Sequence, residues 1–149
     1  MSRISGINMD HSEDLEIVKY RPGDVHKPHV DQYQDEEELK KESPIYGNRY
    51  AQGLLMLSQP KLGGNFAMPL LGISVVPHPG TLVIWHNTDR NGNMDQRSYH
   101  GGCKVFVGHK VAGSTCAMYL DQDKEKCAAV EYHHGHGMNQ TMCDSSKCN

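Results

Sequence analysis

The feature that most constrains this chain is a histidine and an aspartate two residues apart, His29 and Asp31, followed much later by His100. On a β-strand, residues i and i+2 point to the same face, so His29 and Asp31 can project together into one barrel mouth. The third ligand then has to come from another strand. Two histidines and a carboxylate form the facial triad that holds non-haem Fe(II) and leaves positions open for a substrate acid and O₂. A His-x-Asp pair alone is a weak signal, because a surface loop in a chain with 10 histidines easily contains one.

The rest of the sequence consists mainly of short extended segments punctuated by glycine and proline, with weak helical periodicity. Many short strands with frequent turns favour a barrel or jelly roll. We therefore expect a mainly β fold with few short helices. The expected strands, of which the second, third and fourth should be buried, are Leu15–Tyr20, Tyr50–Leu57, Thr81–Trp85, Lys104–Val107 and Gly113–Leu120.

Five ordered blocks of sequence, within roughly residues 3 to 120, resemble the catalytic domain of prolyl 4-hydroxylases, in particular the animal collagen-type alpha subunits. The family shows Tyr-x-x-Gly-x-x-Tyr-x-Pro-His-x-Asp in the region of the first block. This resemblance implies a double-stranded β-helix, the jelly-roll barrel of Fe(II)- and 2-oxoglutarate-dependent dioxygenases. The blocks are Leu15–Asp31, Asn48–Ala51, Gly63–Pro69, Val76–Asn87 and His100–Lys110.

The resemblance also implies roles for individual residues. His29, Asp31 and His100 match the iron ligands of the family. Lys110 matches the lysine that pairs with the distal carboxylate of 2-oxoglutarate, and Tyr20 matches a tyrosine that assists this lysine. L-ascorbate is expected, by the same resemblance, to rescue oxidised iron.

The substrate side departs from the family pattern. Arg49 matches an arginine near the peptide substrate, whereas His26 stands where the family has a substrate-side tyrosine. The iron and oxo-acid anchors are kept while the wall that faces the peptide has changed, so we expect catalytic competence with altered substrate preference. The other departures are Gln52, Met56, Asn65, Phe66, Lys104, Val111 and Cys116, the last two at positions usually held by tryptophan.

Three functional hypotheses remain open at the level of sequence. The first is a dioxygenase that hydroxylates peptidyl proline in a proline-rich or collagen-like polypeptide, with a protein disulfide isomerase as a further expected partner. The second is a non-catalytic binding module with an altered peptide groove. The third is a structural zinc site that uses the same three ligands, since zinc accepts histidine and aspartate readily.

Bulk properties limit the other classes. A chain of 149 residues, 37% of them hydrophobic, fits one domain with a modest core. The net charge of −3 gives no footprint for nucleic-acid binding, and no run has the length of a transmembrane helix. Residues 1–6 lack the apolar region of a secretory signal, so we expect a truncated or partial gene product, or one isoform. The resemblance nevertheless implies the lumen of the endoplasmic reticulum.

The end of the chain differs in character from the rest. We expect residues 1–120 to form the dioxygenase domain and residues 121–149 to form a tail that is disordered or loosely tethered. The odd count of 5 cysteines leaves at least one unpaired. Collagen-type relatives have two cysteines spaced as Cys103 and Cys127 are, which implies a disulfide suited to an oxidising compartment. The alternative is a set of reduced thiols in a cytosolic chain.

Two polar segments interrupt the strands. Residues 32–47 are the most polar insertion, which we interpret as a solvated loop or short helix, with a mobile lid over the active site as the alternative. Residues 88–97 form a second polar loop rich in Asn, Asp and Gly.

Overall fold

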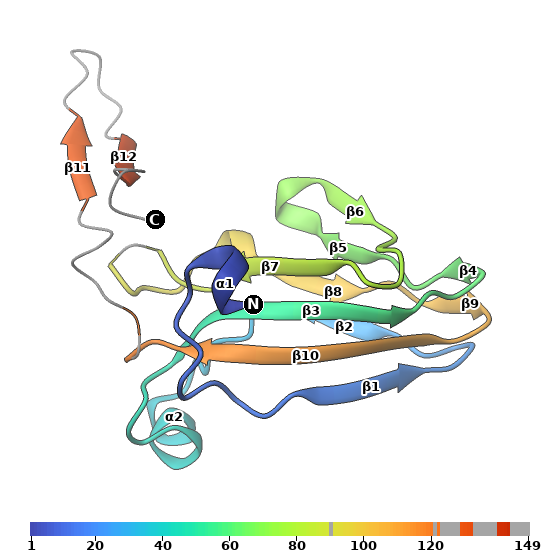
Figure 1. Ribbon diagram of the computed structural model, residues 1–149, viewed down its shortest axis with the longest axis horizontal. Helices are drawn as coiled ribbons and strands as arrows, with labels where there is room; N and C mark the ends of the chain where they lie inside the picture. The colour runs from blue at the N-terminus through green and yellow to red at the C-terminus, as the bar shows by residue number, and fades with distance from the viewer. Residues whose placement is uncertain (90, 121, 123–128, 133–139, 144–149) are drawn as a thin grey trace.

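The computed structural model describes the whole chain except residues 90, 121, 123–128, 133–139 and 144–149 (Figure 1). Two antiparallel sheets form the body of the molecule, and four short helical segments, two α-helical and two 3₁₀, accompany them in the described part of the chain. The elements are α1 (Ser2–Ser5), β1 (Glu16–Tyr20), β2 (His26–His29), α2 (Glu36–Glu42), β3 (Arg49–Ser58), β4 (Leu62–Gly63), β5 (Phe66–Met68), the 3₁₀ turn η1 (Pro69–Leu71), β6 (Ile73–Val75), β7 (Leu82–His86), the 3₁₀ turn η2 (Gln96–Ser98), β8 (His100–Gly102), β9 (Val105–Val107), β10 (Lys110–Met118), β11 (Ala129–Tyr132) and β12 (Gln140–Cys143).

The larger sheet has the strand order β1-β10-β3-β7, and the smaller one has the order β2-β8-β5-β6. All of their pairings are antiparallel, and the two sheets lie as layers one behind the other (Figure 1). The chain crosses repeatedly from one sheet to the other, from β1 to β2, from β2 to β3, from β6 to β7 and from β7 to β8, as in a jelly roll. The predicted mainly β, double-stranded β-helix fold is confirmed.

Side chains that alternate along β3 divide the core into two clusters. Leu54 points between the sheets, where it packs with Phe66, Met68 and Trp85. Ala51 lies on the opposite face of β3 and packs with Ile7, and α1 lies over this outer face near β3 and β7 (Figure 1). The alternation is the period of two expected of a strand that is covered on both faces.

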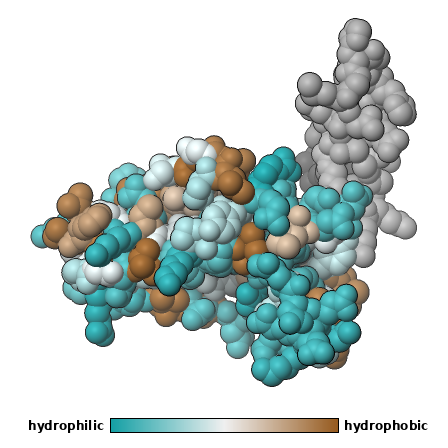
Figure 2. Space-filling model, turned by 180° about the vertical axis from the view of Figure 1, so that it is seen from behind, coloured by the Kyte–Doolittle hydropathy of each residue, from teal (hydrophilic) through white to brown (hydrophobic). Residues whose placement is uncertain are grey.

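The expected strands all occur, with differences at their ends and in burial. The final strand begins at Lys110 rather than Gly113, and this shift matters because it places Lys110 inside the sheet. The segment Lys104–Val107 is not buried as predicted. Only Val105 is in the core, whereas Phe106 is 60% exposed, because β9 pairs with β4 in a separate two-stranded hairpin. Figure 2 shows hydrophobic side chains at the end of the molecule that carries this hairpin.

The polar segment 32–47 forms the short helix α2, as one of the two interpretations predicted. Asp35 caps its N-terminus by accepting a hydrogen bond from Glu37 N at 2.7 Å. Acidic residues occupy its first turn, and Lys40 and Lys41 occupy its last turn, which suits the helix dipole. Apart from Leu39 the helix consists of charged residues, and no residue of the segment lines the cavity described below. The structure therefore gives no support to a lid.

Within the tail, β11 pairs with β12 in antiparallel fashion. The proposed domain boundary at residue 120 stays a prediction, and the histidines at 133, 134 and 136 lie outside the described residues. Cys127 lies outside them too, so its pairing with the exposed Cys103 also stays a prediction. Among the described residues, none of the helices combines the length and apolar composition that a bilayer crossing requires.

Candidate metal centre

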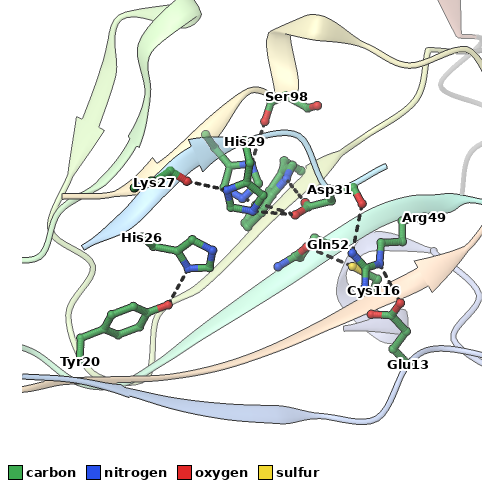
Figure 3. Close-up of polar contacts among 12 residues, drawn as sticks. Glu13, Tyr20, His26, Lys27, His29, Asp31, Arg49, Gln52, Ser98 and Cys116 are labelled. Carbon is green, nitrogen blue, oxygen red and sulfur yellow. Dashed lines mark hydrogen bonds and ion pairs between the residues drawn. The ribbon is translucent and has the colours of Figure 1, made fainter. Parts of the chain in front are cut away.

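The structure brings the three predicted ligands together at one end of the smaller sheet. His29 ends β2 and His100 begins β8, and the two residues are direct partners in the antiparallel ladder. Asp31 follows His29 by two residues and turns its carboxylate toward both rings (Figure 3). One ligand atom from each residue can be chosen so that all three atoms lie within 4.8 Å of one another.

Hydrogen bonds to the backbone set the orientation of both imidazole rings. His29 Nδ1 lies 2.8 Å from Lys27 O, and His100 Nδ1 lies 2.8 Å from Ser98 O. A carbonyl oxygen only accepts, so Nδ1 of each ring carries the proton, and Nε2 is left with its lone pair. Metal-bound histidines typically donate a hydrogen bond of this kind from the ring nitrogen that does not bind the metal.

The Nε2 atoms face a carboxylate oxygen. Asp31 Oδ1 lies 3.3 Å from His29 Nε2 and 3.7 Å from His100 Nε2. Lone pairs that converge in this way repel one another unless a proton or a metal ion lies among them. The bond to Asp31 raises the pKa of His29, whereas burial lowers the pKa of His100.

The site has an apolar wall on one side and is open on the other. The Trp85 ring lies 4.5 Å from the His100 ring and 5.0 Å from the Phe66 ring, measured between centroids. Trp85 Nε1 also donates a hydrogen bond to Asp31 Oδ2 at 3.2 Å. The side chain of His29 is 35% exposed while that of Asp31 is 4% exposed, so the open side of the centre is the side of His29.

A cavity of about 370 Å³ lies between the two sheets, and the open side of the His-Asp-His cluster faces into it. Both sheets contribute to its wall, as expected for the interior of a jelly roll. Its lining includes His29 and His100, the predicted residues Lys110, Tyr20 and His26, and also Glu16, Val18, Val25, Gln52, Leu54, Phe66, Trp85, Gly101, Gly102, Ala112 and Ser114.

Lys110 is the most unusual residue in the cavity wall. It is only 4% exposed, and no hydrogen bond or ion pair joins its Nζ to any described residue. Its Nζ lies 5.2 Å from the centroid of the Tyr20 ring, which is a cation–π contact. Burial lowers the pKa of Lys110, because the charged form has lost water without gaining a carboxylate.

Two glycines of β8 make room for these side chains. A Cβ at Gly102 would lie 3.4 Å from Lys110 Nζ and 3.3 Å from His26 Cβ. A Cβ at Gly101 would lie 2.9 Å from His26 O and 3.0 Å from Pro28 N, both in the backbone of β2. Gly101 therefore lets β8 approach β2, and Gly102 leaves space at the Lys110 ammonium.

The predicted contact of Tyr20 differs in detail from the structure. Tyr20 was expected to assist Lys110, and its ring lies beside the ammonium, whereas its hydroxyl lies 2.7 Å from His26 Nδ1 (Figure 3). The His26 ring in turn stacks on His29, with centroids 4.6 Å apart and planes 9° apart. The histidine at position 26 thus links the tyrosine to a predicted iron ligand. A tyrosine at this position has no ring nitrogen to do so.

Arg49 is not among the residues that line the cavity. Its Nε donates to Glu13 Oε1 at 2.7 Å, and its Nη1 donates to Asp31 O at 3.1 Å (Figure 3). Its guanidinium also lies over the Tyr33 ring, 4.7 Å from the centroid. Its predicted contact with substrate stays a prediction, and the structure adds a second role in fixing the backbone at Asp31.

Gln52 is the site residue that the sequence did not identify as functional. Its amide lies 2.7 Å from Asp31 Oδ2 and 3.0 Å from Asp31 Oδ1, with its nitrogen facing the carboxylate. The sequence marked position 52 only as a departure from the family. The role of Gln52 becomes visible only from its place in the ladder, opposite Trp85 on β7.

The sequence matches no protein-family model. It is similar to curated proteins over most of its length. It is 35% identical over 108 residues to prolyl 4-hydroxylase subunit alpha-1 of Homo sapiens, a match that covers 72% of this chain and 20% of the relative. It is 34% identical over 106 residues to prolyl 4-hydroxylase subunit alpha-2 of Caenorhabditis elegans, covering 71% and 20%. The chain thus spans about a fifth of the length of these relatives.

The fold is similar to that of solved structures. The viral collagen prolyl hydroxylase of Paramecium bursaria Chlorella virus-1, crystallised as a 2OG complex, superposes with a TM-score of 0.63 at 22% identity. The superposition covers 72% of this chain and 59% of the viral one. A truncated form of the same enzyme gives the same TM-score.

Proposed function

Because this chain carries a prolyl 4-hydroxylase-like domain, we propose that it is an Fe(II)- and 2-oxoglutarate-dependent dioxygenase that hydroxylates peptidyl proline. The observation that carries the proposal is the pairing of two features in one cavity. A His-Asp-His cluster forms one part of the site, and a buried ammonium that no described residue joins by a hydrogen bond or ion pair forms another. The first suits a metal ion and the second suits an anion.

His29, Asp31 and His100 would hold the iron. Two imidazole nitrogens and a carboxylate oxygen match the facial triad of non-haem Fe(II) in kind and number. The backbone bonds at both Nδ1 atoms leave both Nε2 atoms available as ligands. A cation there would also remove the repulsion between these lone pairs and Asp31 Oδ1.

Lys110 would hold the distal carboxylate of 2-oxoglutarate. A carboxylate at Nζ would supply the ion pair that the buried ammonium lacks. Gly102 leaves the space for it, and the Tyr20 ring fixes the lysine from one side. With 2-oxoglutarate and O₂, bound iron supplies the chemistry in which the oxo-acid loses CO₂ to give succinate and a substrate C–H bond becomes C–OH.

We propose that the organic substrate is a proline-containing polypeptide that enters past His29 and His26. An extended polyproline II segment fits such a site because its backbone is unpaired and accessible. Cys116 and Val111, at positions where the family usually has tryptophan, are small side chains that do not line the cavity. Neither offers the aromatic contact surface that tryptophan has. Loose binding of short proline-rich peptides is therefore expected.

The remaining expectations rest on the resemblance and the relatives. Collagen-like substrates, L-ascorbate, a protein disulfide isomerase partner and the endoplasmic reticulum lumen are all proposed here as properties of a chain of this family.

Coupled product formation tests the proposal. Succinate formed from 2-oxoglutarate and hydroxyproline formed in a proline-rich peptide are measured together, with Fe(II) and ascorbate present. We expect both products in equal amounts, and His29→Ala to reduce each by at least about 10²-fold. Lys19→Ala, an exposed lysine of the same sheet as Lys110, serves as a control and should change neither. Succinate without hydroxyproline would contradict the peptide substrate, and the absence of both would favour the binding-module hypothesis.

A further inference from the structure

The two oxygens of Asp31 have different surroundings. Oδ1 is the atom that faces Nε2 of His29 and Nε2 of His100. Oδ2 is directed away from the rings and accepts a hydrogen bond from Trp85 Nε1 at 3.2 Å. The carboxylate thus presents one oxygen to the histidines and the other to the larger sheet.

The side-chain amide nitrogen of Gln52 is a further hydrogen-bond donor to Asp31 on the side of the larger sheet. A carboxylate only accepts hydrogen bonds, so the end of the amide that faces it has to be the nitrogen. This nitrogen then donates at 2.7 Å to Oδ2 and at 3.0 Å to Oδ1. The sulfur of the buried Cys116 lies 3.0 Å from the same end of the amide (Figure 3).

The ladder explains why these side chains meet. Gln52 on β3 is opposite Trp85 on β7 and opposite Cys116 on β10. Residues that are direct partners in neighbouring strands point to the same face of a sheet. The three therefore form one row across the inner face, and Asp31 of the opposite layer lies against this row.

We propose that Gln52 is a positioning residue which, together with Trp85, holds Asp31 Oδ2 so that only Oδ1 can bind the metal. This inference rests on the proposed function and goes beyond it. An aspartate whose second oxygen is held in this way binds through one oxygen and occupies a single coordination position. More positions then remain for the oxo-acid and O₂. Gln52 is one of the residues at which this chain departs from the family pattern described above.

A purely structural role for Gln52 is the competing explanation. In that case the amide would fill space and satisfy the buried carboxylate, and its loss would lower stability without changing the metal site. The two explanations differ in metal affinity and in the spectrum of the bound ion, so both are measured on folded protein.

The test is the binding of Co(II) to the full, metal-free chain, without 2-oxoglutarate. Trp85 is the only tryptophan, and its indole nitrogen bonds to Asp31, so quenching of its fluorescence reports on this centre. We expect Gln52→Met, which keeps the length of the side chain but has no donor, to weaken Co(II) binding by about 10- to 100-fold. The visible absorption of bound Co(II) should also change, because it depends on coordination number.

Two further variants make the result decisive. Gln59→Met removes an exposed glutamine near the end of the same strand and should leave the affinity within about twofold of the original. Gln52→Asn shortens the side chain by one methylene and should weaken binding in the same direction, which provides an answer if Gln52→Met does not fold.

The outcomes separate this inference from the proposed function. If the original chain binds Co(II), His29→Ala does not, and the Gln52 variants match the original in affinity and spectrum, the role of Gln52 is refuted while the metal centre stands. If the original chain and His29→Ala respond alike, the metal centre itself is refuted, and the inference with it.

Discussion

At the scale of single residues, the site combines groups that are unfavourable for folding. Three lone-pair donors converge at His29, His100 and Asp31. The buried ammonium of Lys110 has no hydrogen-bond or ion-pair partner among the described residues. Burying a charge without a partner costs free energy, and such a cost persists where a ligand offsets it. The chemistry of these residues is therefore better explained by ligands than by stability.

Lys110 gives this argument a measurable form. We expect Lys110→Met to stabilise the metal-free protein against unfolding by roughly 1–3 kcal/mol at neutral pH, since it replaces a desolvated charge by an apolar side chain of similar length. Lys19→Met, on an exposed lysine of the same sheet, should stay within about 0.5 kcal/mol of the original.

The sign of the pH dependence follows from the lowered pKa of Lys110. Between that lowered pKa and the ordinary lysine value of about 10.4, the unfolded chain binds more protons than the folded one, so stability rises with pH. The advantage of Lys110→Met should thus be greatest at neutral pH and shrink as the pH rises through this range. Urea unfolding at several pH values measures it, and a variant less stable than the original at neutral pH would show that the ammonium is not a cost.

At the scale of elements, the site depends on how closely β8 lies against β2. This pairing makes His29 and His100 direct neighbours, and it requires a residue without Cβ at Gly101. Gly102 is also a glycine, but the atoms near it belong to the side chains of His26 and Lys110. Adjacent glycines therefore serve different purposes, one for the fold and one for the cavity.

Alanine at each position should separate these purposes. We expect Gly101→Ala to destabilise the fold by about 1–3 kcal/mol, because its Cβ would meet the backbone of β2, and to weaken metal binding. Gly102→Ala should have a smaller effect on stability but weaken 2-oxoglutarate binding by crowding Lys110 Nζ. Thermal unfolding and calorimetric titration check both, and equal effects of the two variants on both measurements would contradict the distinction.

The elements also show which features the sequence could and could not predict. The period of two and the turn glycines suffice for the five expected strands, whereas β2, β4, β5, β6 and β8 were not among them. His29 ends β2 and Asp31 lies two residues later, outside the strand, so their spacing predicts that they lie close together but not the conformation that brings them together. The burial of Lys104–Val107 was predicted wrongly, because an apolar run does not reveal that β9 pairs with the short β4 instead of joining a main sheet. The helix α1 leaves no clear periodic signal in four residues.

At the scale of the whole molecule, the site is made by contacts between layers, and such contacts are the least visible in sequence. The row of Trp85, Gln52 and Cys116 meets Asp31 only because the larger sheet faces the smaller one. Likewise, the pairing of Arg49 with Glu13 joins segments 36 residues apart, and the bond of Tyr20 to His26 joins a strand of the larger sheet to a strand of the smaller one. The predicted ligand set could be identified from spacing and resemblance, but the residues that orient it could not.

Equilibrium binding of 2-oxoglutarate, measured anaerobically by calorimetry with and without Fe(II), tests the central claim most directly. The account predicts one bound 2-oxoglutarate per chain, with an affinity that falls at least about tenfold when iron is omitted or in His29→Ala. Lys110→Ala should weaken 2-oxoglutarate binding to a similar degree while leaving iron binding largely intact. An affinity for 2-oxoglutarate that is unchanged by removal of the metal and by Lys110→Ala would show that this cavity is not its binding site.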